Sequence, residues 1–481
     1  MSGGTTLRRT KIVCTLGPAT ASPDGVAALL EAGADVFRLN FSHGDRESHR
    51  RTIHMVREVA RERGREVAIL QDLAGPKIRL GELPGGERDL TTGGRVDLVP
   101  TGGDVGPDDL PVAYPYLLED VHEGERILLA DGLIELKVVE RGADRLRCEV
   151  VVGDRVASHK GVNLPGTTLR VPSFTDKDRD DLAVGLEEAV DLVALSFVRH
   201  ERDIEPVREM MAGRPNPPLV IAKLEKPQAI ERLEAILAAV DGVMVARGDL
   251  GVEMPVEQVP LVQKRVISET RRAGKPVITA TQMLRSMVTS PRPLRAEASD
   301  VANAVLDGTD AVMLSEETAI GQYPGEAVRV LDRIARVVEP TLDWDAILRE
   351  PISPVLPRTA AALARSAGRL ARDVEAAAIV AFTVSGSTAR LIAHLRPGMP
   401  VLGLTPSLAV ARQLALSWGV VPVVTDVLGS GDLMLETANR WVLKAGLAAP
   451  GDRVVVTAGV PFGVRGTTNL AMVLEVEAGS A

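Results

Sequence analysis

The sequence is poor in the residues and segments that mark several common classes of protein. Its two cysteines, Cys14 and Cys148, are too few for a disulfide scaffold or a structural zinc site, which favours a reducing, cytoplasmic location. Its seven histidines are scattered and form no zinc-binding pair such as HExxH. No apolar run approaches the ~20 residues that cross a bilayer, and the first residues lack the apolar core of a secretory signal. These absences argue against a membrane protein and against a secreted one.

Positive charge is also in short supply. The 481 residues include 56 Lys and Arg against 65 Asp and Glu, which gives a formal net charge of −9. A general nucleic-acid-binding protein needs a basic face, so this balance argues against nucleic acid as a partner. With 45% hydrophobic and 25% charged residues, the chain has the composition of a soluble globular protein. Its length predicts two to four domains.

The first two thirds of the chain repeat one unit, a short β-branched apolar run followed by a helical stretch. Such runs predict strands that are buried on both faces, hence a parallel sheet covered by helices. Eight units predict a closed (β/α)₈ barrel, whose active site lies at the carboxyl ends of its strands. The runs are residues 11–19, 35–44, 66–75, 191–200, 219–226, 242–251, 276–284 and 310–318.

Two other segments interrupt or follow this pattern. Residues 80–171 are rich in Gly and Pro and alternate apolar with polar residues, which predicts a small β-barrel domain inserted after the third strand. At the catalytic face, such an insertion could close over the substrate as a lid. Residues 347–481 restart the strand and helix pattern and predict an open, doubly wound α/β domain. The barrel domain would then comprise residues 1–79 and 172–346.

Charged and polar residues gather where the predicted barrel strands end. Lys223 and Glu225 are two positions apart on one strand, so their side chains point to the same face. One carboxylate from each of two neighbouring strands, Glu225 and Asp249, is enough for a Mg²⁺ that takes its other ligands from water and substrate. Cationic side chains and the metal would form a pocket for an anion, phosphate above all, as phosphoryl transfer requires. The full set is Arg38, Asn40, Ser42, His43, Asp72, Lys77, Arg79, Lys223, Glu225, Arg247, Asp249, Thr281 and Gln282.

Plainer interpretations of these residues stay open at this point. A Lys-x-Glu pair on a strand is usually an ion pair at the surface. Asp249 and residues 40–44 would also serve as turns, and Thr281 would also serve as a helix cap. The functional interpretation is favoured because five strands end in such residues, in a fold whose catalytic face is fixed.

Seven sequence blocks occur in the order that they have in one family. VFRLNFSHG, GPKIRLGE, SHKGVNLPG, IAKLEKPQAI, MVARGDLGVE, ITATQMLRSM and AVMLSEETAIGQYP resemble the signature blocks of the pyruvate kinases. The resemblance extends from Thr10 to about Val476. It implies a homotetramer that transfers a phosphoryl group from phosphoenolpyruvate to ADP and yields pyruvate and ATP.

The resemblance also implies a role for each matching residue. Lys223 would stabilise the transferring phosphoryl group and the enolate oxygen, and Thr281 would lie where the enolate is protonated, directly or through water. Glu225 and Asp249 would hold Mg²⁺, or Mn²⁺ in its place. The implied substrate contacts are Arg38, Gly248, Asp249 and Thr281. The implied nucleotide contacts are Asn40, Phe41, Ser42, His43, Arg79 and Lys160, with Asp131 as the lid's contribution.

The block around residue 77 departs from the pattern of many pyruvate kinases. Those that need K⁺ carry a glutamate where this chain has Lys77, and Leu73 and Ala74 replace the Thr-Lys that accompanies it. Our hypothesis is that the ammonium group supplies the charge of K⁺, so that K⁺ is not required. A solvent-facing lysine is the plain alternative. The positions that would otherwise bind a monovalent cation are Asn40, Ser42, Asp72 and Leu73.

In the C-terminal domain, the segment FTVSGSTAR lies between a predicted strand and a predicted helix. Hydroxyl groups and the backbone N–H groups of a helix N-terminus form a cradle for phosphate. The segment resembles the family's allosteric site for a sugar phosphate or nucleotide, with a well-capped helix as the alternative. The candidate effector residues are Thr383, Ser385, Gly386, Ser387 and Thr388, and residues 458–469 could close over the effector.

Two other functions are compatible with parts of this pattern. A barrel lyase or aldolase acting on pyruvate enolate would share the metal carboxylates, but it would need neither the lid nor Arg79 and Lys160. A catalytically silent sugar-phosphate sensor would bind its ligand without phosphorylating ADP. The intact set of catalytic residues favours the kinase.

Overall fold

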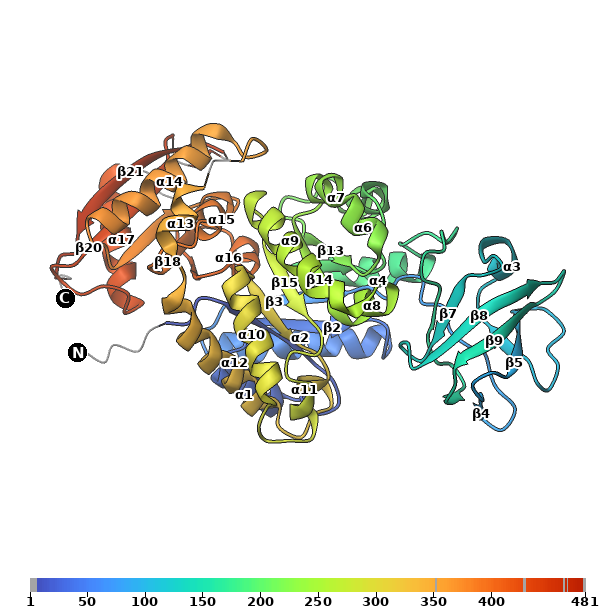
Figure 1. The fold of residues 1–481 in the computed structure, drawn as a ribbon. Coiled ribbons are helices and arrows are strands. Elements are labelled where there is room, and N and C mark those ends of the chain that lie inside the picture. The colour runs from blue at the N-terminus through green and yellow to red at the C-terminus, as the bar shows by residue number, and fades with distance from the viewer. Residues whose placement is uncertain (1–6, 351–352, 427–429, 462, 465, 479–481) are drawn as a thin grey trace.

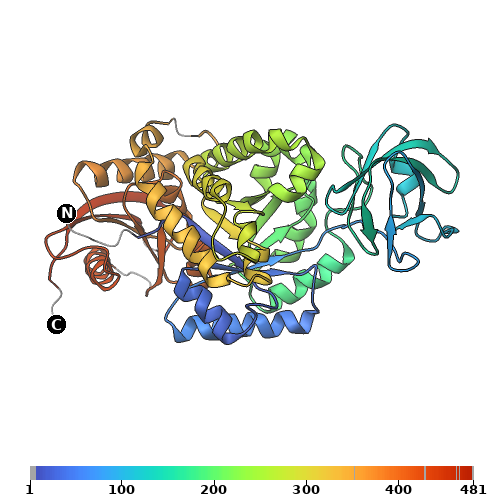
Figure 2. The same ribbon diagram turned by 60° about the horizontal axis from the view of Figure 1, so that its bottom comes forward.

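The computed structural model describes residues 7–350, 353–426, 430–461, 463–464 and 466–478. Figures 1 and 2 show three bodies in a row, with a barrel in the middle, the C-terminal domain on one side and a group of β-strands on the other. In the part of the chain that is described, no helix is long and apolar enough to cross a membrane.

Eight parallel strands close into the central barrel in the order β1-β16-β15-β14-β13-β12-β3-β2. Their residues are mostly buried, because helices cover the outer face and side chains fill the inside. The structure therefore confirms the fold class that the apolar runs predict. The strands are β1 (Lys11–Thr15), β2 (Val36–Asn40), β3 (Ala68–Asp72), β12 (Leu192–Leu195), β13 (Leu219–Leu224), β14 (Gly242–Ala246), β15 (Val277–Ala280) and β16 (Ala311–Leu314).

Local capping residues fix where the outer helices begin and end. The helix α1 begins after Ser22, whose side chain accepts a hydrogen bond from Gly25 N, and it ends at Gly33, whose φ is 115°. Capping boxes at Asp45 and Thr175 start α2 and α4. The barrel helices are α1 (Pro23–Ala32), α2 (Arg46–Glu62), α4 (Asp176–Glu187), α5 (Glu205–Met211), α6 (Pro227–Glu231), α7 (Leu233–Ala239), α8 (Arg247–Glu253), α9 (Val259–Arg272), α10 (Arg295–Asp307), α11 (Glu316–Ala319) and α12 (Pro324–Val338).

The barrel strands end sooner than the apolar runs indicate. The strand β14 ends at Ala246, so Arg247 and Asp249 lie in the first turn of α8. Thr281 and Gln282 follow β15 with φ angles of 69° and 56°, a region that non-glycine residues, β-branched ones above all, rarely adopt. These four residues therefore lie just past the strands, whereas Arg38, Asn40, Asp72 and Lys223 lie within β2, β3 and β13, towards the carboxyl rim of the barrel.

The residues between β3 and α4 form a separate β unit. Six of its strands pair in the order β11-β7-β8-β9-β5-β6, and β10 pairs with β4. Isolated bridges from Arg79 to Gly161 and from Leu80 to Val112 join the two edges of the six-stranded sheet, which thereby closes around its own apolar core. The elements are β4 (Glu87–Asp89), β5 (Arg95–Pro100), β6 (Leu110–Val112), α3 (Leu117–Asp120), β7 (Arg126–Leu129), β8 (Ile134–Arg141), β9 (Leu146–Val152), β10 (Arg155–Ala157) and β11 (Val162–Asn163).

The C-terminal domain contains a sheet with strand order β19-β18-β17-β20-β21. Helices α14, α15 and α16 pack on one face and α17 on the other. One edge differs from a purely parallel sheet: β21 runs antiparallel to β20, because residues 460–467 are too few for a crossover helix. The elements are α13 (Trp344–Arg349), α14 (Arg358–Asp373), β17 (Ala378–Phe382), α15 (Ser387–Ala393), β18 (Val401–Thr405), α16 (Leu408–Leu414), β19 (Val420–Val424), α17 (Gly431–Lys444), β20 (Arg453–Gly459) and β21 (Thr468–Glu475).

The C-terminal domain covers the amino end of the barrel. Ala415 and Leu416, just after α16, pack into the apolar cluster inside the barrel. The guanidinium of the buried Arg396 lies 3.0 Å (Nη1 to Oδ1) from Asp310, which directly precedes β16. The opposite, carboxyl end of the barrel faces the inserted strands and is left for the functional site.

Candidate active site

A buried cluster of charges lies at the carboxyl ends of β2, β3 and β13. Lys223 Nζ lies 2.8 Å from Glu225 Oε1 and 3.3 Å from Asp72 Oδ1. Arg38 Nε donates to the other oxygen of Asp72 at 2.6 Å. The side chains of Lys223 and Glu225 are 12% and 2% exposed. The Lys-x-Glu pair is therefore buried, which overturns the plain interpretation as an ion pair at the surface.

The charged side chains of this cluster shift one another's pKa values. Burial opposes the charged form of Asp72, but Lys223 and Arg38 outweigh it and hold the pKa of Asp72 below its usual value. Although burial opposes it, the neighbouring carboxylates of Asp72 and Glu225 raise the pKa of Lys223. Glu225 behaves differently, because burial and the Asp249 carboxylate raise its pKa against the attraction of Lys223. Glu225 therefore lies buried between a cation, Lys223, and a second carboxylate, Asp249.

Glu225 and Asp249 have the chemistry to hold a divalent cation. Glu225 Oε2 accepts a hydrogen bond from Phe197 N at 2.7 Å. Asp249 is half-buried, and its side chain makes no hydrogen bond or ion pair with the residues that the structure describes. Nowhere in that part of the chain do three His, Cys, Asp or Glu side chains gather as a metal site. Two carboxylates with room for water and substrate oxygens fit Mg²⁺, which keeps several waters when it binds.

Hydrogen bonds join the loop after β15 to the start of α8. Gly248 N donates to Thr281 Oγ1 at 2.7 Å, so the Thr281 side chain bonds to the first turn of α8 and does not cap the helix that follows it in the chain. The unusual backbone of Thr281 is held by Arg247, which donates to the carbonyls of Thr281 (2.8 Å) and Ala280 (3.3 Å). Arg247 is itself fixed by Asp300, with 2.6 Å between Nη1 and Oδ1. Strain of this kind is typical of positions that a function requires.

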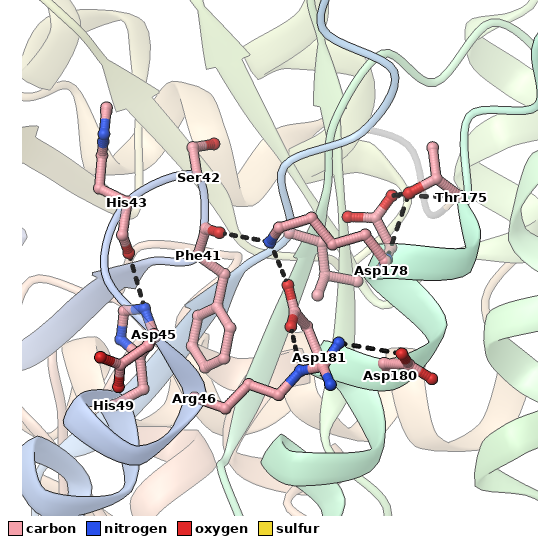
Figure 3. A network of polar contacts seen from close by, with 12 residues as sticks. Phe41, Ser42, His43, Asp45, Arg46, His49, Thr175, Asp178, Asp180 and Asp181 are labelled. Atoms are coloured by element: carbon pink, nitrogen blue, oxygen red, sulfur yellow. Dashed lines mark hydrogen bonds and ion pairs between the residues drawn. The ribbon is translucent and has the colours of Figure 1, made fainter.

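The loop after β2 has its backbone tied down while two of its side chains stay available (Figure 3). Asn40 Oδ1 accepts a hydrogen bond from Ser42 N at 3.1 Å. The turn at residues 40–44, which was one of the plainer interpretations of the sequence, is therefore present. Lys177 of α4 donates to Phe41 O at 2.8 Å. Figure 3 shows the side chains of Ser42 and His43 pointing away from this network. Among the described residues, neither side chain takes part in the hydrogen bonds that hold the loop.

The remaining predicted nucleotide contacts lie where the inserted strands meet the barrel. Arg79 Nη1 donates to His159 O at 3.1 Å, and Lys160 is exposed. Burial, and then the positive charges of Arg79, Lys77 and Arg38, lower the pKa of His43. These cations therefore lie within electrostatic range of the loop after β2.

Lys77 is exposed, as the plain alternative expects, but it stands at the mouth of the site. It lines a cavity of about 30 Å³ between insert and barrel, together with Asp131 and Asp249. Asp72, one of the candidate monovalent-cation ligands, is already paired through both oxygens with Arg38 and Lys223. The structure thus brings Lys77 to the site without giving its side chain a hydrogen bond or ion pair among the described residues.

Sequence reasoning missed one residue that holds the charged cluster together. Ser196 follows β12 directly; its hydroxyl donates to Leu73 O at 2.7 Å and accepts a hydrogen bond from Lys223 Nζ at 2.7 Å. Its place at the carboxyl end of a barrel strand is a signal that could have singled it out.

The candidate effector segment lines a second cavity, of about 180 Å³, where β17 ends. Thr383, Ser385, Ser387 and Thr388 line it, whereas Gly386 caps α15 with a φ of 81°. Thr383 Oγ1 is buried without a hydrogen-bond partner among the described residues. The loop of residues 458–469 borders the cavity, and its residues 462 and 465 lie outside the described part. Polar groups and space are thus present for a small ligand.

The fold and the site together define a class of protein. A parallel barrel whose carboxyl rim buries an arginine and a lysine beside carboxylates with unused ligand capacity is equipped to bind a phosphorylated anion with a divalent cation. Such a site belongs to a barrel enzyme that acts on a phosphorylated substrate.

Comparison with known proteins gives the family. The model for "Pyruvate kinase, barrel domain" matches residues 7–328, and the model for "Pyruvate kinase, alpha/beta domain" matches residues 361–474. Pyruvate kinase from Methylorubrum extorquens is 46% identical, with 97% of each chain covered. Pyruvate kinase 2 of Synechocystis is 47% identical, over 98% of this chain and 80% of that one.

A solved structure agrees with these relatives. The crystal structure of a pyruvate kinase from Cryptosporidium parvum superposes with a TM-score of 0.92 and 36% identity, over 98% of this chain and 96% of that one. The chain belongs to the pyruvate kinase family and is a phosphotransferase. This membership favours a kinase over the lyase and over the silent sensor.

Proposed function

We propose that this chain transfers the phosphoryl group of phosphoenolpyruvate to ADP at the carboxyl rim of the barrel. The observation that carries the proposal is the buried cluster of Lys223 with Asp72 and Glu225, next to an Asp249 that has no partner of its own among the described residues. The products are pyruvate and ATP. The proposed lid is residues 80–171, and the proposed regulatory domain is residues 347–481.

The chain's own cations stabilise the charges that move in this reaction. Lys223 stays protonated because its carboxylate neighbours raise its pKa, so a fixed positive charge stands where the enolate oxygen develops its negative charge. Arg38, held by Asp72 and by Thr15 Oγ1 at 3.0 Å, contacts the phosphoryl group from the side of β2. Glu225 and Asp249 hold Mg²⁺, or Mn²⁺ in its place, which when bound neutralises charge on the substrate oxygens.

Thr281 is the residue that we assign to the proton transfer. Its oxygen accepts a hydrogen bond from Gly248 N, so its own O–H hydrogen is left to donate to substrate or to an ordered water. The held backbone of the loop fixes the direction in which that hydrogen points. Thr281→Val is expected to slow protonation of the enolate more than phosphoryl transfer. Comparing the rate of deuterium incorporation into pyruvate in deuterated water with the rate of ATP formation would show this.

The nucleotide phosphates lie along the loop after β2 in this proposal. The side chains of Ser42 and His43 point away from the network that ties the loop down. The proposed contacts are Asn40, Phe41, Ser42, His43, Arg79 and Lys160, with Asp131 reaching in from the lid.

Lys77 is proposed to take the place of K⁺. Its support is its position beside the cavity that Asp131 and Asp249 line, and the fact that Arg38 and Lys223 already neutralise Asp72. The remaining positions that would contact a monovalent cation are Asn40, Ser42 and Leu73. Lys77→Glu is expected to make turnover depend on K⁺.

The cavity of about 180 Å³ in the C-terminal domain is proposed to bind a phosphorylated effector. The hydroxyl of Thr383, which is buried without a hydrogen-bond partner among the described residues, supports this proposal. A hydrogen bond to a ligand would satisfy this polar group. We also propose a homotetramer, on family membership. Calorimetry with sugar phosphates and with nucleoside monophosphates, and sedimentation of the free chain, test the two statements separately.

A coupled assay of pyruvate formation tests the proposed reaction. Phosphoenolpyruvate, ADP and Mg²⁺ are supplied with either K⁺ or tetramethylammonium as the monovalent cation. Equal activity in both supports the reaction and the role of Lys77 together. Activity with K⁺ alone keeps the reaction and refutes the role of Lys77. A folded protein that is inactive in both, with effectors added, contradicts the proposed function.

A further inference from the structure

One buried ion pair lies between the barrel and the inserted domain and has no part in the proposed chemistry. Lys226 Nζ lies 2.6 Å from Glu253 Oε1, and the two side chains are 7% and 1% exposed. Asn163 Nδ2 donates to the same oxygen from the inserted domain, at 3.2 Å. Among the described residues, this is the only hydrogen bond between side chains that joins residues 80–171 to the barrel, and no ion pair joins them.

Each partner belongs to a segment that also carries part of the site. Lys226 follows Glu225 directly in the chain. Glu253 is the last residue of α8, whose first turn contains Asp249. Asn163 ends β11 in the inserted domain. One carboxylate oxygen therefore ties the insert to the two barrel segments that supply the candidate metal ligands.

The arrangement suits a contact that forms and breaks. A buried carboxylate that loses its only cation is strongly destabilised. Glu253 keeps Lys226 as its partner whether or not the insert is in place, so withdrawal of Asn163 loses one hydrogen bond to a charged group and no ion pair. Such a bond is strong enough to favour one position of the insert and weak enough to be released in each catalytic cycle.

Other contacts of the insert do not play this part. Arg199 donates to Leu169 O at 2.5 Å and to Val171 O at 2.7 Å. Those residues lie where the chain returns to the barrel, so that tether would stay in place if the insert moved. Asn163 and Lys226, in contrast, line the same small cavity as Asp249.

We propose that Glu253 is a positioning residue: held by Lys226, it latches the inserted domain over the active site through Asn163. The latch couples the position of the lid to the segments that carry Glu225 and Asp249. This inference rests on the proposed function, because the latch would serve that reaction.

An isosteric exchange of amide and carboxylate tests the latch. Asn163→Asp places a second carboxylate beside Glu253, and Glu253→Gln leaves Lys226 without its anion. Each single variant is expected to lower kcat/KM for ADP by roughly tenfold or more. The double variant N163D/E253Q keeps the shape, the charge and the hydrogen bond, and is expected to return kcat/KM to within about threefold of the starting value. Losses that simply add in the double variant would overturn the proposal.

A distance measurement separates the latch from loss of stability. Cys14 and Cys148 are buried, so spin labels can be directed to Asp104→Cys on the insert and Leu261→Cys on the barrel, both exposed positions. The unaltered latch is expected to give one narrow distance distribution, Asn163→Asp a broader and longer one, and N163D/E253Q the narrow one again. Unchanged distances in N163D contradict the latch even if the enzyme is active. Distances that respond in a chain without kinase activity support the latch and refute the proposed function.

Discussion

At the amino end of the barrel the buried carboxylates Asp310 and Glu339 are saturated with protein partners, whereas the carboxyl end also carries a half-buried carboxylate whose side chain has none among the described residues. At the amino end, Asp310 Oδ1 accepts hydrogen bonds from Arg396 and from Trp418 N, and Oδ2 accepts one from Val277 N. At the carboxyl end, the side chain of Asp249 has no hydrogen bond or ion pair among the described residues. A buried carboxylate whose oxygens are paired with protein donors holds the fold together, whereas a half-buried one whose side chain has no protein partner is available to a ligand.

A second carboxylate at the amino end repeats the saturated pattern. Glu339 accepts hydrogen bonds from the backbone N–H groups of Arg9 and Thr10, at 2.6 to 3.0 Å. The guanidinium of Arg9 stacks over Trp344 and Trp418, 5.5 and 5.7 Å from the ring centroids. Arg9 therefore joins the segment before β1 to Trp418 of the C-terminal domain, and we assign these charges no chemistry.

The largest effect on stability is expected at the saturated end. Arg396→Met leaves Asp310 buried without its cation and should lower the free energy of unfolding by about 3–5 kcal/mol. Turnover per folded molecule should change far less, because the site lies at the other end of the barrel. Denaturant unfolding followed by circular dichroism, with the assay on the same sample, measures both. Unchanged stability would show that the contact with Asp310 contributes nothing.

The largest effect on turnover is expected at the open end. Lys223→Ala removes a preorganised cation from the developing enolate and should slow turnover at least about a hundredfold while substrate still binds. Steady-state kinetics and calorimetry with phosphoenolpyruvate separate the two. Lys264→Ala, which removes an exposed lysine of α9 that pairs with Asp307 of α10, is the control and should leave turnover unchanged. Near-normal turnover of Lys223→Ala rejects the assignment.

A smaller effect on the free energy of unfolding is expected from the titration of His394, at the interface between barrel and C-terminal domain. Burial, with the charges of Arg396 and Arg271, lowers the pKa of His394 to about 3. The unfolded chain binds this proton near pH 6.5, so His394 favours folding above that pH and stability falls as the pH drops towards 3. The slope from one group is at most about 1.4 kcal/mol per pH unit. Unfolding between pH 7 and 5 should become less pH-dependent in His394→Gln; an unchanged slope contradicts this.

The smallest effect is expected where an ion pair faces water. Arg232 Nη2 lies 2.6 Å from Glu201 Oε1, with side chains 51% and 31% exposed. Arg232→Gln should change the free energy of unfolding by no more than about 0.5 kcal/mol, because solvent already stabilises both charges. A loss as large as that of Arg396→Met would show that burial is not what separates the two classes of pair.

The sequence predicts the barrel well because its strands are buried on both faces and read as continuous apolar runs. It does not predict the antiparallel β21, since the direction of an edge strand depends on the length of a loop rather than on a pattern of residues. The sequence also predicts that the side chains of Lys223 and Glu225 lie together, because the two residues are two positions apart on one predicted strand. It misses Ser196 and the pair of Lys226 with Glu253, because contacts between distant segments leave no local period.

The central claim is that carboxylate oxygens at the carboxyl rim are available to bind a divalent cation. Measuring the binding of such a cation tests this claim most directly. Titration of Mn²⁺ in the presence of phosphoenolpyruvate, followed by electron paramagnetic resonance, should show one site per chain. The account predicts that Asp249→Asn weakens this site at least about tenfold, and that Arg396→Met at the saturated end leaves it unchanged. Equal Mn²⁺ binding by the original chain and by Asp249→Asn would contradict it.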